Sequence, residues 1–393
     1  MPLSVILDVL LVLVLVSFLV YGYRSGLVRS VSGIVGIVVG GALAYVLAPL
    51  AGALVESPEW RVVVTVGASL LLIAAGLTAG MTLGDSMRTR VARSPLRGVD
   101  RLVGAAASVV AAALVTSTIA FGIGTLGVPL LSQPIANSQV LRVIGQSTPD
   151  GLTRMLAAAR SFAVRESLPQ IADAFAGAAP TIPDVETGSP ELDRAAASIV
   201  RITGTAFACG QNQSGSGFVV APDRIVTNAH VVAGVDEPVV ETPRDGSRVG
   251  RVVYFDPVDD LAVIAVEGLD TAALELGTPL TAGDTAIVGG YPFGGPFSAH
   301  PAEVAVVGPL VVPDIYGEST AARDVYTLAS DVQQGESGGP VLATSGDAVG
   351  IVFAKGATTE GVGYAATLVE LEPVVVAATG LTGSVASGTC VRG

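Results

Sequence analysis

Hydrophobic residues are concentrated in four long runs at the start of the chain. The runs cover Leu3–Val20, Leu27–Leu54, Val62–Leu83 and Leu102–Val128. Each is long enough to cross a bilayer as a helix, which takes about 20 residues. The first run could instead be a signal peptide, but it lacks a basic start and three more runs follow it. The pattern predicts an all-α domain of four transmembrane helices over residues 1–130.

The charged residues between the runs predict how this domain is oriented. Arginines fill the loops after the first and third runs: Arg24, Arg29, Arg88, Arg90, Arg93, Arg97 and Arg101. The loop between the second and third runs instead carries Glu56 and Glu59 against Arg61. Because cytoplasmic loops are enriched in Lys and Arg, the chain before the first run and everything after the fourth are expected outside the cytoplasm.

Glycines recur within the second and third runs. Gly36 and Gly40 in one, and Gly76 and Gly80 in the other, have the four-residue spacing that lets membrane helices approach closely. Glycine and alanine are common throughout the chain, so the spacing alone does not identify a particular contact.

The pattern changes after the fourth run. Leu141–Ala178 has helix-like periodicity, and a Pro-containing polar stretch follows up to Pro190. Glu191–Val200 is expected to be a short helix or arm that leads into a first strand at Ile199–Ile202. We therefore divide the remainder into a periplasmic linker over 131–192 and a β-rich domain over 193–393.

Composition supports a membrane protein and argues against nucleic acid as a partner. The 393 residues are 50% hydrophobic, with a mean hydropathy of +0.65, which is too apolar for an average soluble protein. The formal net charge is −13. The arginine clusters lie between hydrophobic runs, so topological anchoring explains them better than nucleic-acid binding.

The tract Gly335-Glu336-Ser337-Gly338-Gly339-Pro340 has the form of a serine nucleophile loop. Such a loop places a hydroxyl at a sharp turn and directs the N–H groups of Gly335 and Ser337 at the oxygen that becomes negative during acyl transfer. An ordinary Gly/Ser loop is the alternative for this tract taken alone.

Two upstream motifs supply the partners that a nucleophilic serine needs. His230 lies in Thr-Asn-Ala-His-Val-Val after a strand-like run, and imidazole can take a proton near neutral pH. Asp260 directly precedes the apolar Leu-Ala-Val-Ile, and Asp259 beside it is expected to be solvated. The other histidine, His300, is expected to be a loop residue.

The chain order His230, Asp260, Ser337 is that of chymotrypsin-type proteases. Residues 193–393 resemble the HtrA-related trypsin-like proteases of bacteria, in which the catalytic aspartate immediately precedes an apolar run. Asp8 and the segment Tyr21-Gly22-Tyr23-Arg24-Ser25-Gly26 resemble the colicin V production (CvpA) membrane family. The resemblance implies an all-β, chymotrypsin-like double antiparallel β-barrel after the membrane helices.

Together the two parts resemble the acid-resistance membrane serine proteases of mycobacteria and other actinobacteria (the MarP group). The resemblance implies a multi-pass protein of the inner membrane with a periplasmic endopeptidase that acts on cell-envelope proteins under acid and oxidative stress. No cofactor and no metal site are expected, and the linker is a candidate for self-cleavage. The alternative is a catalytically silent protease fold that acts as a binding or sensor protein.

The chain has two cysteines, Cys209 and Cys390. A bond between them would tie the C-terminal tail to the start of the protease domain, and disulfides persist outside the cytosol. Two unpaired buried thiols are the alternative. In the MarP group the corresponding pair is bonded, so the resemblance implies a disulfide here.

Substrate selection is expected near Asp331, Phe353 and Gly356. In trypsin-like folds the residue six before the nucleophile forms the floor of the S1 pocket, and here this residue is Asp331. A buried carboxylate would select Arg or Lys; otherwise Asp331 bonds to backbone or water. Phe353 and Gly356 lie on the segment expected to form the pocket wall and to pair with the substrate backbone.

Overall fold

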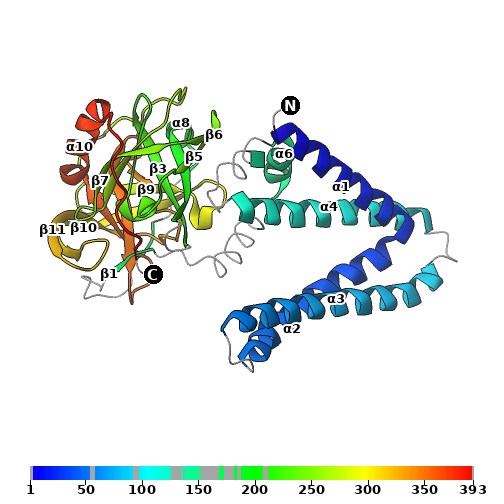
Figure 1. The fold of residues 1–393 in the computed structure, drawn as a ribbon. Helices are drawn as coiled ribbons and strands as arrows, with labels where there is room; N and C mark the ends of the chain where they lie inside the picture. Colours follow the sequence, from blue (N-terminus) through cyan, green and yellow to red (C-terminus); the bar gives the residue numbers. More distant parts are fainter. Residues whose placement is uncertain are drawn as a thin grey trace. The chain divides into compact units, whose positions relative to one another are not determined.

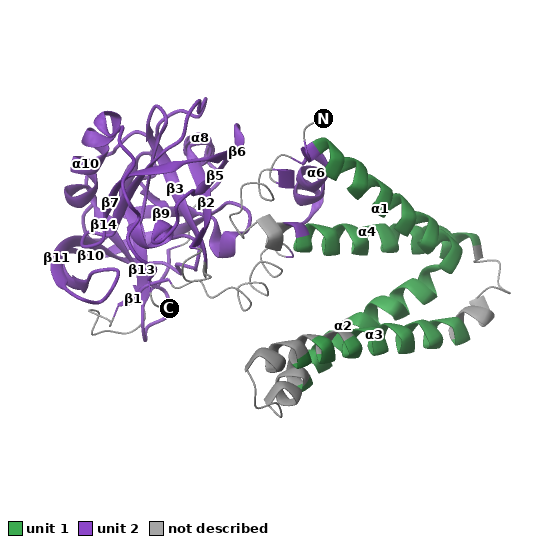
Figure 2. Ribbon diagram, viewed as in Figure 1, with its two compact units in different colours: residues 1, 5–119 green, residues 2–4, 120–393 purple. Residues whose placement is uncertain are grey.

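The computed structural model describes residues 3–53, 58–91, 97–124, 134–135, 138–149, 152, 168–171, 181–183, 187–206 and 211–391. It divides into two compact units, residues 1 and 5–119 and residues 2–4 and 120–393 (Figure 2).

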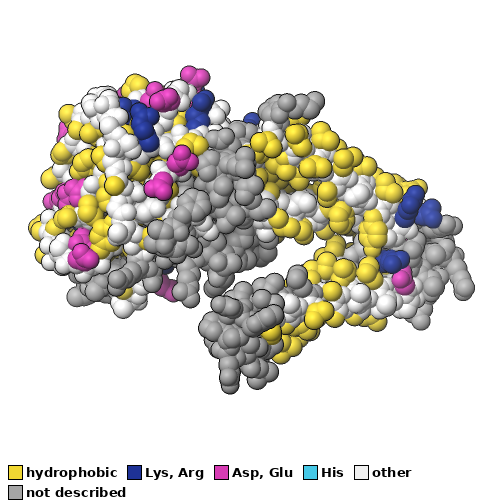
Figure 3. All heavy atoms as spheres, viewed as in Figure 1, with side chains coloured by type: hydrophobic (Ala, Val, Ile, Leu, Met, Phe, Trp, Pro, Cys, Tyr) yellow, Lys and Arg dark blue, Asp and Glu magenta, His cyan; other side chains and the backbone are white. Residues whose placement is uncertain are grey.

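The first unit is helical, as the hydrophobic runs predict. Its helices are α1 (Leu3–Ser25), α2 (Leu27–Ala53), α3 (Pro58–Val91) and α4 (Arg97–Gly124) (Figure 1). Three described stretches are long and apolar enough to cross a membrane: Leu3–Ser25, Leu27–Ala44 and Gly98–Ala120. Within α3 the described apolar stretch is the shorter Leu71–Ser86. Hydrophobic side chains cover much of the visible surface of this unit (Figure 3).

Glycines bring α2 and α3 into backbone contact. A Cβ on Gly36 would lie 2.2 Å from the Gly76 carbonyl oxygen, and one on Gly80 would lie 2.2 Å from that of Ser32. Such distances are far below van der Waals contact, so only glycine allows this approach. The four-residue glycine spacing therefore does mark a helix contact.

The CvpA-like turn between α1 and α2 is bound by α4. Asp100 Oδ1 accepts hydrogen bonds from the N–H groups of Leu27 (3.0 Å) and Val28 (3.3 Å), which lack helical partners at the start of α2. The carboxylate also lies against Gly26, whose φ is +78°. Asp100 thus acts as a remote N-terminal cap for α2.

The second unit contains two curled sheets, which are antiparallel except for β1, a strand that pairs in parallel with β13. The first has the strand order β6-β5-β2-β3-β4-β8-β7, and the second β1-β13-β12-β9-β10-β11-β14, with β13 also pairing with β14. The strands of the first sheet are β2 (Ile199–Ala206), β3 (Gln211–Ala221), β4 (Arg224–Thr227), β5 (Val239–Thr242), β6 (Gly246–Val249), β7 (Arg251–Asp256) and β8 (Leu261–Ala265). Those of the second are β1 (Gln170–Ile171), β9 (Thr285–Gly290), β10 (Ser298–Pro313), β11 (Thr320–Ala329), β12 (Pro340–Leu342), β13 (Ala348–Gly356) and β14 (Val362–Thr367).

Short helices complete this unit: α6 (Gln139–Ser147), α8 (Pro190–Ala196), α9 (Ala229–Val232), α10 (Leu368–Ala377) and the 3₁₀ turns η1 (Pro292–Gly294) and η2 (Ala378–Gly380). The predicted arm before the first strand is thus α8. The helix expected over Leu141–Ala178 is wrong at Gln170–Ile171, which form β1, and most of its remaining length lies outside the described residues.

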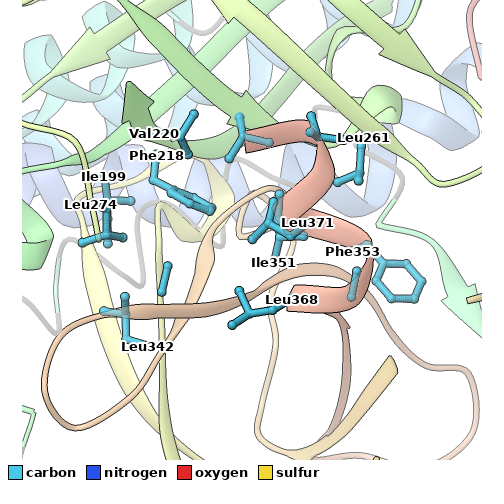
Figure 4. Close-up of a cluster of buried hydrophobic side chains, with 14 of the residues drawn as sticks. Ile199, Phe218, Val220, Leu261, Leu274, Leu342, Ile351, Phe353, Leu368 and Leu371 are labelled. Atoms are coloured by element: carbon cyan, nitrogen blue, oxygen red, sulfur yellow. The ribbon is translucent and has the colours of Figure 1, made fainter. Parts of the chain in front are cut away.

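Three hydrophobic clusters follow from the alternation of side chains along the strands. Each curled sheet has its own cluster. The cluster of the first sheet includes Val219 and Ile264, and that of the second includes Val288 and Val341. The third lies between the sheets, where Phe218 and Leu261 face Ile351 (Figure 4). Leu368 and Leu371 of α10 pack on it, so the C-terminal helix holds the two sheets together.

Candidate active site

The predicted nucleophile loop connects the 331–334 segment to β12. Gly335 and Gly338 have φ of +88° and +82°, the region that favours glycine. A Cβ on Gly335 would lie 2.5 Å from the Tyr291 carbonyl oxygen. The Gly338 N–H donates to the Val352 carbonyl (2.8 Å), which fixes the loop on β13. Ser337, at the turn, is 3% exposed.

Ser216 of β3 attaches this loop to the first sheet. Its N–H donates to the Ser337 carbonyl (2.8 Å), and its hydroxyl donates to the Gly335 carbonyl (2.7 Å). Its own carbonyl accepts the hydroxyl of Thr227 (2.7 Å), the last residue of β4. Ser216 therefore holds the serine loop beside the segment that carries His230. Sequence reasoning missed this residue, because its strand position alone does not indicate which loop it contacts.

His230 lies on α9, directly after β4, and contacts Asp260. Asp260 Oδ1 accepts the backbone N–H of His230 (2.9 Å), and Oδ2 lies 2.7 Å from His230 Nδ1. Because an ionised carboxylate only accepts hydrogen bonds, Nδ1 carries the hydrogen and Nε2 is left as the acceptor of the neutral ring. Both side chains are buried, at 6% and 2% exposed.

Asp260 adopts a backbone conformation unusual for aspartate, with φ of +56°. Two contacts hold it: Asn228 Nδ2 donates to the Asp260 carbonyl (2.9 Å), and the buried Arg323 donates from Nη1 to the Asp259 carbonyl (3.1 Å). Arg323 also donates from Nη2 to the Pro313 carbonyl (3.0 Å), so it links the aspartate turn to the second sheet. Asn228 belongs to the Thr-Asn-Ala-His-Val-Val motif, which assigned it no role of its own, and no motif contains Arg323.

Among the hydrogen bonds and ion pairs of the described residues, none joins the Asp259 side chain to His230. Asp259 is only partly buried. Burial raises its pKa, the charges of Asp256 and Glu370 raise it further, and Arg323 opposes them. Of the two neighbouring aspartates considered from the sequence, Asp260 is the one that the structure brings to the histidine.

Among the described residues of this region, several buried polar atoms lack a hydrogen-bond partner, Asn228 Oδ1 and Arg323 Nε included. Within the described part of the chain, His230 Nε2 and Ser337 Oγ make no hydrogen bond. Their segments adjoin, because a Cβ on Gly338 would lie 3.2 Å from the Asn228 nitrogen. One atom is an acceptor and the other a donor, and such pairs are often loose until substrate binds.

The N–H groups of Gly335 and Ser337 are also unused. Among the hydrogen bonds of the described residues, neither group donates to a protein acceptor. Both belong to the loop that carries the serine hydroxyl, so they are available to an oxyanion formed there.

A cavity of about 730 Å³ lies next to this loop. Asp331, Gln333, Lys355 and Gly356 contribute to its lining. Asp331 is exposed, so of the two alternatives drawn from the sequence the buried carboxylate at the floor of a pocket is not the one seen here. Lys355, the chain's one lysine, lines the same cavity.

Phe353, predicted to lie on the segment that forms the pocket wall, does not line this cavity, whereas Gly356 of the same segment does. The Phe353 side chain is 2% exposed and belongs to the cluster between the sheets (Figure 4). The Arg323 guanidinium lies 4.8 Å from the centre of its ring. The direction of side chains along β13 turns Phe353 into the core.

The linker occupies the edge of β13 beside the cavity. Gln170 and Ile171 pair in parallel with Lys355 and Gly356, and the Lys355 N–H donates to the Pro169 carbonyl (3.1 Å). Gln170 and the later linker residue Ile182 also line the cavity.

His300, expected in a loop, is a residue of β10. It pairs with Val288 of β9, and its ring meets Glu336 of the serine loop. The hydrogen bond to Glu336 crosses between segments far apart in the chain, which the sequence pattern could not reveal.

Of the two cysteines, only Cys390 lies within the described residues. Its sulfur is 2.9 Å from the position of a Cβ on Gly234, and the Ala206 Cβ is 3.3 Å from that same position. The tail before it is held by the Gly234 N–H, which donates to the Ser387 carbonyl (3.0 Å). Cys390 therefore lies close to Ala206, the last residue of β2. Cys209 follows Ala206 by three residues in the sequence. No group of three histidine, cysteine, aspartate or glutamate side chains that could hold a metal ion occurs in the ranges that the structure covers.

Comparison with known families matches both parts of the chain. Residues 215–351 match the trypsin-like peptidase domain, and residues 7–149 match the colicin V production protein. These matches fall on the protease motifs and on the apolar helices respectively.

Individual relatives agree. Serine protease Rv3671c of Mycobacterium tuberculosis (strain ATCC 25618 / H37Rv) is 30% identical over 393 residues, covering 98% of each chain. The putative serine protease HhoB of Synechocystis is 36% identical over 39% of this chain and 37% of its own. A probable periplasmic serine endoprotease DegP-like of Pseudomonas fluorescens is 30% identical over 38% of this chain and 32% of its own. The crystal structure of the Rv3671c protease from M. tuberculosis in its active form superposes with a TM-score of 0.51 and 35% identity, over 56% of this chain and 100% of that one.

Proposed function

The chain belongs to the family of membrane-anchored, HtrA-like serine proteases that includes Rv3671c, and on that premise we propose that its catalytic residues are Ser337, His230 and Asp260. The observation that carries the proposal is the double contact of Asp260 with His230, next to a buried serine hydroxyl that lacks a partner.

The proposed reaction is hydrolysis of a peptide bond in two steps. Ser337 Oγ attacks the scissile carbonyl carbon while its proton passes to His230 Nε2, and Asp260 stabilises the imidazolium that forms. The carbonyl oxygen becomes negative and accepts hydrogen bonds from the N–H groups of Gly335 and Ser337. His230 then gives the proton to the leaving amine, which departs and leaves an acyl-enzyme. Water, deprotonated by His230, attacks the ester and releases the acid and the free serine.

The buried positions of the three side chains support this chemistry. A neutral imidazole whose Nδ1–H is held by a carboxylate keeps Nε2 in the form that accepts a proton. Water is largely excluded from the site, since His230, Asp260 and Ser337 are each no more than 6% exposed. Electrostatic stabilisation of the transition state is stronger in such surroundings than in water.

The experiment is hydrolysis of labelled casein by full-length protein in detergent. Release of peptides by the wild type and its loss in Ser337→Ala supports the assignment of the nucleophile. Equal hydrolysis by both proteins overturns it. If neither protein hydrolyses casein or is labelled at its serine by a fluorophosphonate, a catalytically silent protease fold is favoured.

We further propose that the linker is the first peptide to bind at the active site. Strand addition is a common way to bind an extended peptide, and β1 already uses the β13 edge next to the cavity. A substrate that pairs with Lys355 and Gly356 must displace Gln170 and Ile171. Cleavage within the linker would free this edge and release the protease from its membrane anchor.

The cavity favours broad selection at the proposed substrate subsite. Asp331 is exposed, and Lys355 lines the same cavity, so neither charge dominates it. Asp331→Asn is expected to leave hydrolysis after Arg and Lys nearly unchanged, and cleavage products sequenced by mass spectrometry measure this.

We propose four membrane spans with the protease on the periplasmic side of the inner membrane. Three apolar stretches and the colicin V production match support the membrane domain, and the arginine-rich loops support the orientation. Alkaline phosphatase fused after residue 130 should be active. Activity of a reporter that works only in the cytoplasm, fused at the same point, would contradict the proposed orientation.

Finally, we propose cell-envelope proteins as substrates and survival of acid and oxidative stress as the role. The support is the resemblance to the acid-resistance group together with the expected location. Comparing shed peptides from cells carrying wild-type or Ser337→Ala protein, at neutral and mildly acidic pH, tests both. Identical peptides at the two pH values would count against the acid response.

A further inference from the structure

Glu336 is a buried carboxylate in the middle of the serine loop. It is 0% exposed and lies between Gly335 and Ser337, the residues whose N–H groups the proposed mechanism uses. Burying an ionised carboxylate is unfavourable unless it is paired and hydrogen-bonded. The partners of Glu336 therefore help to determine whether the loop keeps this conformation.

Two groups bind the Glu336 carboxylate. Oε2 accepts the N–H of Gln333 (2.7 Å), which closes the turn before the serine. Oε1 lies 3.0 Å from His300 Nε2 on β10. In the part of the chain that the structure describes, His300 is the one side chain able to carry a positive charge that pairs with Glu336.

Both ring nitrogens of His300 face groups that can accept a hydrogen bond. Nε2 lies 3.0 Å from Glu336 Oε1, and Nδ1 lies 3.1 Å from Ser330 Oγ, which is itself 3.1 Å from the Pro301 carbonyl oxygen. When the Ser330 hydroxyl donates to Pro301, its oxygen is left to accept from Nδ1–H. In this arrangement both ring nitrogens carry hydrogens, and the ring is an imidazolium beside the Glu336 carboxylate.

We propose that His300 is a positioning residue for the serine loop, and that its imidazolium holds Glu336 inward and so keeps the Gly335 and Ser337 N–H groups directed at the oxyanion. If His300 loses its charge, Glu336 is left buried without a cation. Gly335, whose conformation suits glycine, is the point at which the loop can turn to bring Glu336 to water. The proposal rests on the serine protease function proposed above.

The surroundings of His300 support a charged ring. Burial lowers its pKa, but the hydrogen bond and charge of Glu336, the charge of Asp331 and the Pro301 carbonyl outweigh burial and leave the pKa above its usual value. The titratable groups that face the ring are Glu336 and Asp331; its β9 neighbour is Val288, and Ser330 follows β11. Loss of the His300 charge is therefore expected to limit the reaction on the alkaline side.

The experiment measures how fast a fluorophosphonate phosphonylates full-length protein in detergent, from about pH 5 to pH 10 on either side of the usual histidine pKa. His300→Gln keeps a polar side chain but no charge, and His300→Lys keeps the charge with a much higher pKa. We expect a reduction of about 10-fold or more in the Gln variant, up to the ~10²–10³-fold that loss of one oxyanion donor costs. The Lys variant should regain most of the rate and lose the alkaline fall.

A role in folding alone would affect both variants alike and leave the shape of the pH profile unchanged. Melting temperatures of the three proteins identify that case. The proposal is overturned if the Gln variant reacts like the wild type at every pH, or if the Lys variant is as slow as the Gln variant and keeps the alkaline fall. A wild type that is not phosphonylated overturns this proposal and the assignment of Ser337 together.

Discussion

Asp260 binds His230 through both of its carboxylate oxygens, one to the backbone N–H and the other to ring Nδ1, at 2.9 and 2.7 Å. The double contact sets both the position of α9 and the orientation of the imidazole. It ties the aspartate turn at the end of the β7–β8 connection to the helix that follows β4. Asp260 and His230 therefore act as a pair, and breaking the pair should lower activity in a way that a change at a neighbouring residue does not.

Asp260→Asn is expected to lower kcat/KM by about 10⁴-fold, because an amide at this position favours the wrong imidazole tautomer. The matched control is Asp259→Asn, at a neighbouring side chain that no hydrogen bond or ion pair of the described residues joins to His230. Casein hydrolysis by both variants measures the effect. A loss in the Asp259 variant as large as in the Asp260 variant would contradict the assignment.

Gly36→Ala should destabilise the helical unit by about 1–3 kcal/mol, since overpacking forces backbone shifts. The added methyl would lie 2.2 Å from the Gly76 carbonyl oxygen. Gly41→Ala is the control, because a Cβ there meets nothing within 4 Å. Loss of helical circular dichroism on heating in detergent compares the two; equal behaviour would show that α2 and α3 do not depend on this contact.

The stability that His300 contributes should depend on pH. Its folded-state pKa is raised, so its contribution is fully present below the usual histidine pKa of about 6.5 and is lost as pH rises through the folded value. The difference in melting temperature between wild type and His300→Gln should therefore be largest in acid and shrink in alkali. A difference that grows with pH would show that the ring is neutral in the folded protein.

Reduction should lower the stability of the protease unit by about 2–5 kcal/mol if Cys209 and Cys390 are bonded. The position of Cys390 beside Gly234 and Ala206 supports this pairing. Melting with and without reductant measures it, with the Cys209→Ser/Cys390→Ser double variant as control. A wild type unaffected by reductant, with two titratable thiols, would contradict the disulfide.

Features that depend on local pattern could be predicted from the sequence. The apolar runs became α1 to α4, and the glycine spacing indicated that helices could approach closely, although the α2–α3 contact itself came from the structure. Asp260 was distinguished from Asp259 by its position before the apolar run that forms β8. In each case the physical cause lies within a few residues of the feature.

Features that depend on strand register could not be predicted from the sequence. Phe353 turns into the core because of where its side chain falls on β13, and His300 meets Glu336 only because β10 and the serine loop are neighbours in the fold. β1 is two residues long, and its strand conformation comes from pairing with Lys355 and Gly356. The helix-like periodicity of the surrounding sequence gave no sign of that pairing.

The account depends most on the activation of Ser337 by His230. The direct measurement is mass spectrometry of full-length protein treated with a fluorophosphonate at neutral pH, with the adduct mapped to its peptide. The account predicts a single adduct on Ser337 in the wild type and its loss in His230→Ala at unchanged melting temperature. An adduct at another serine, or equally fast labelling of Ser337 without His230, would contradict it.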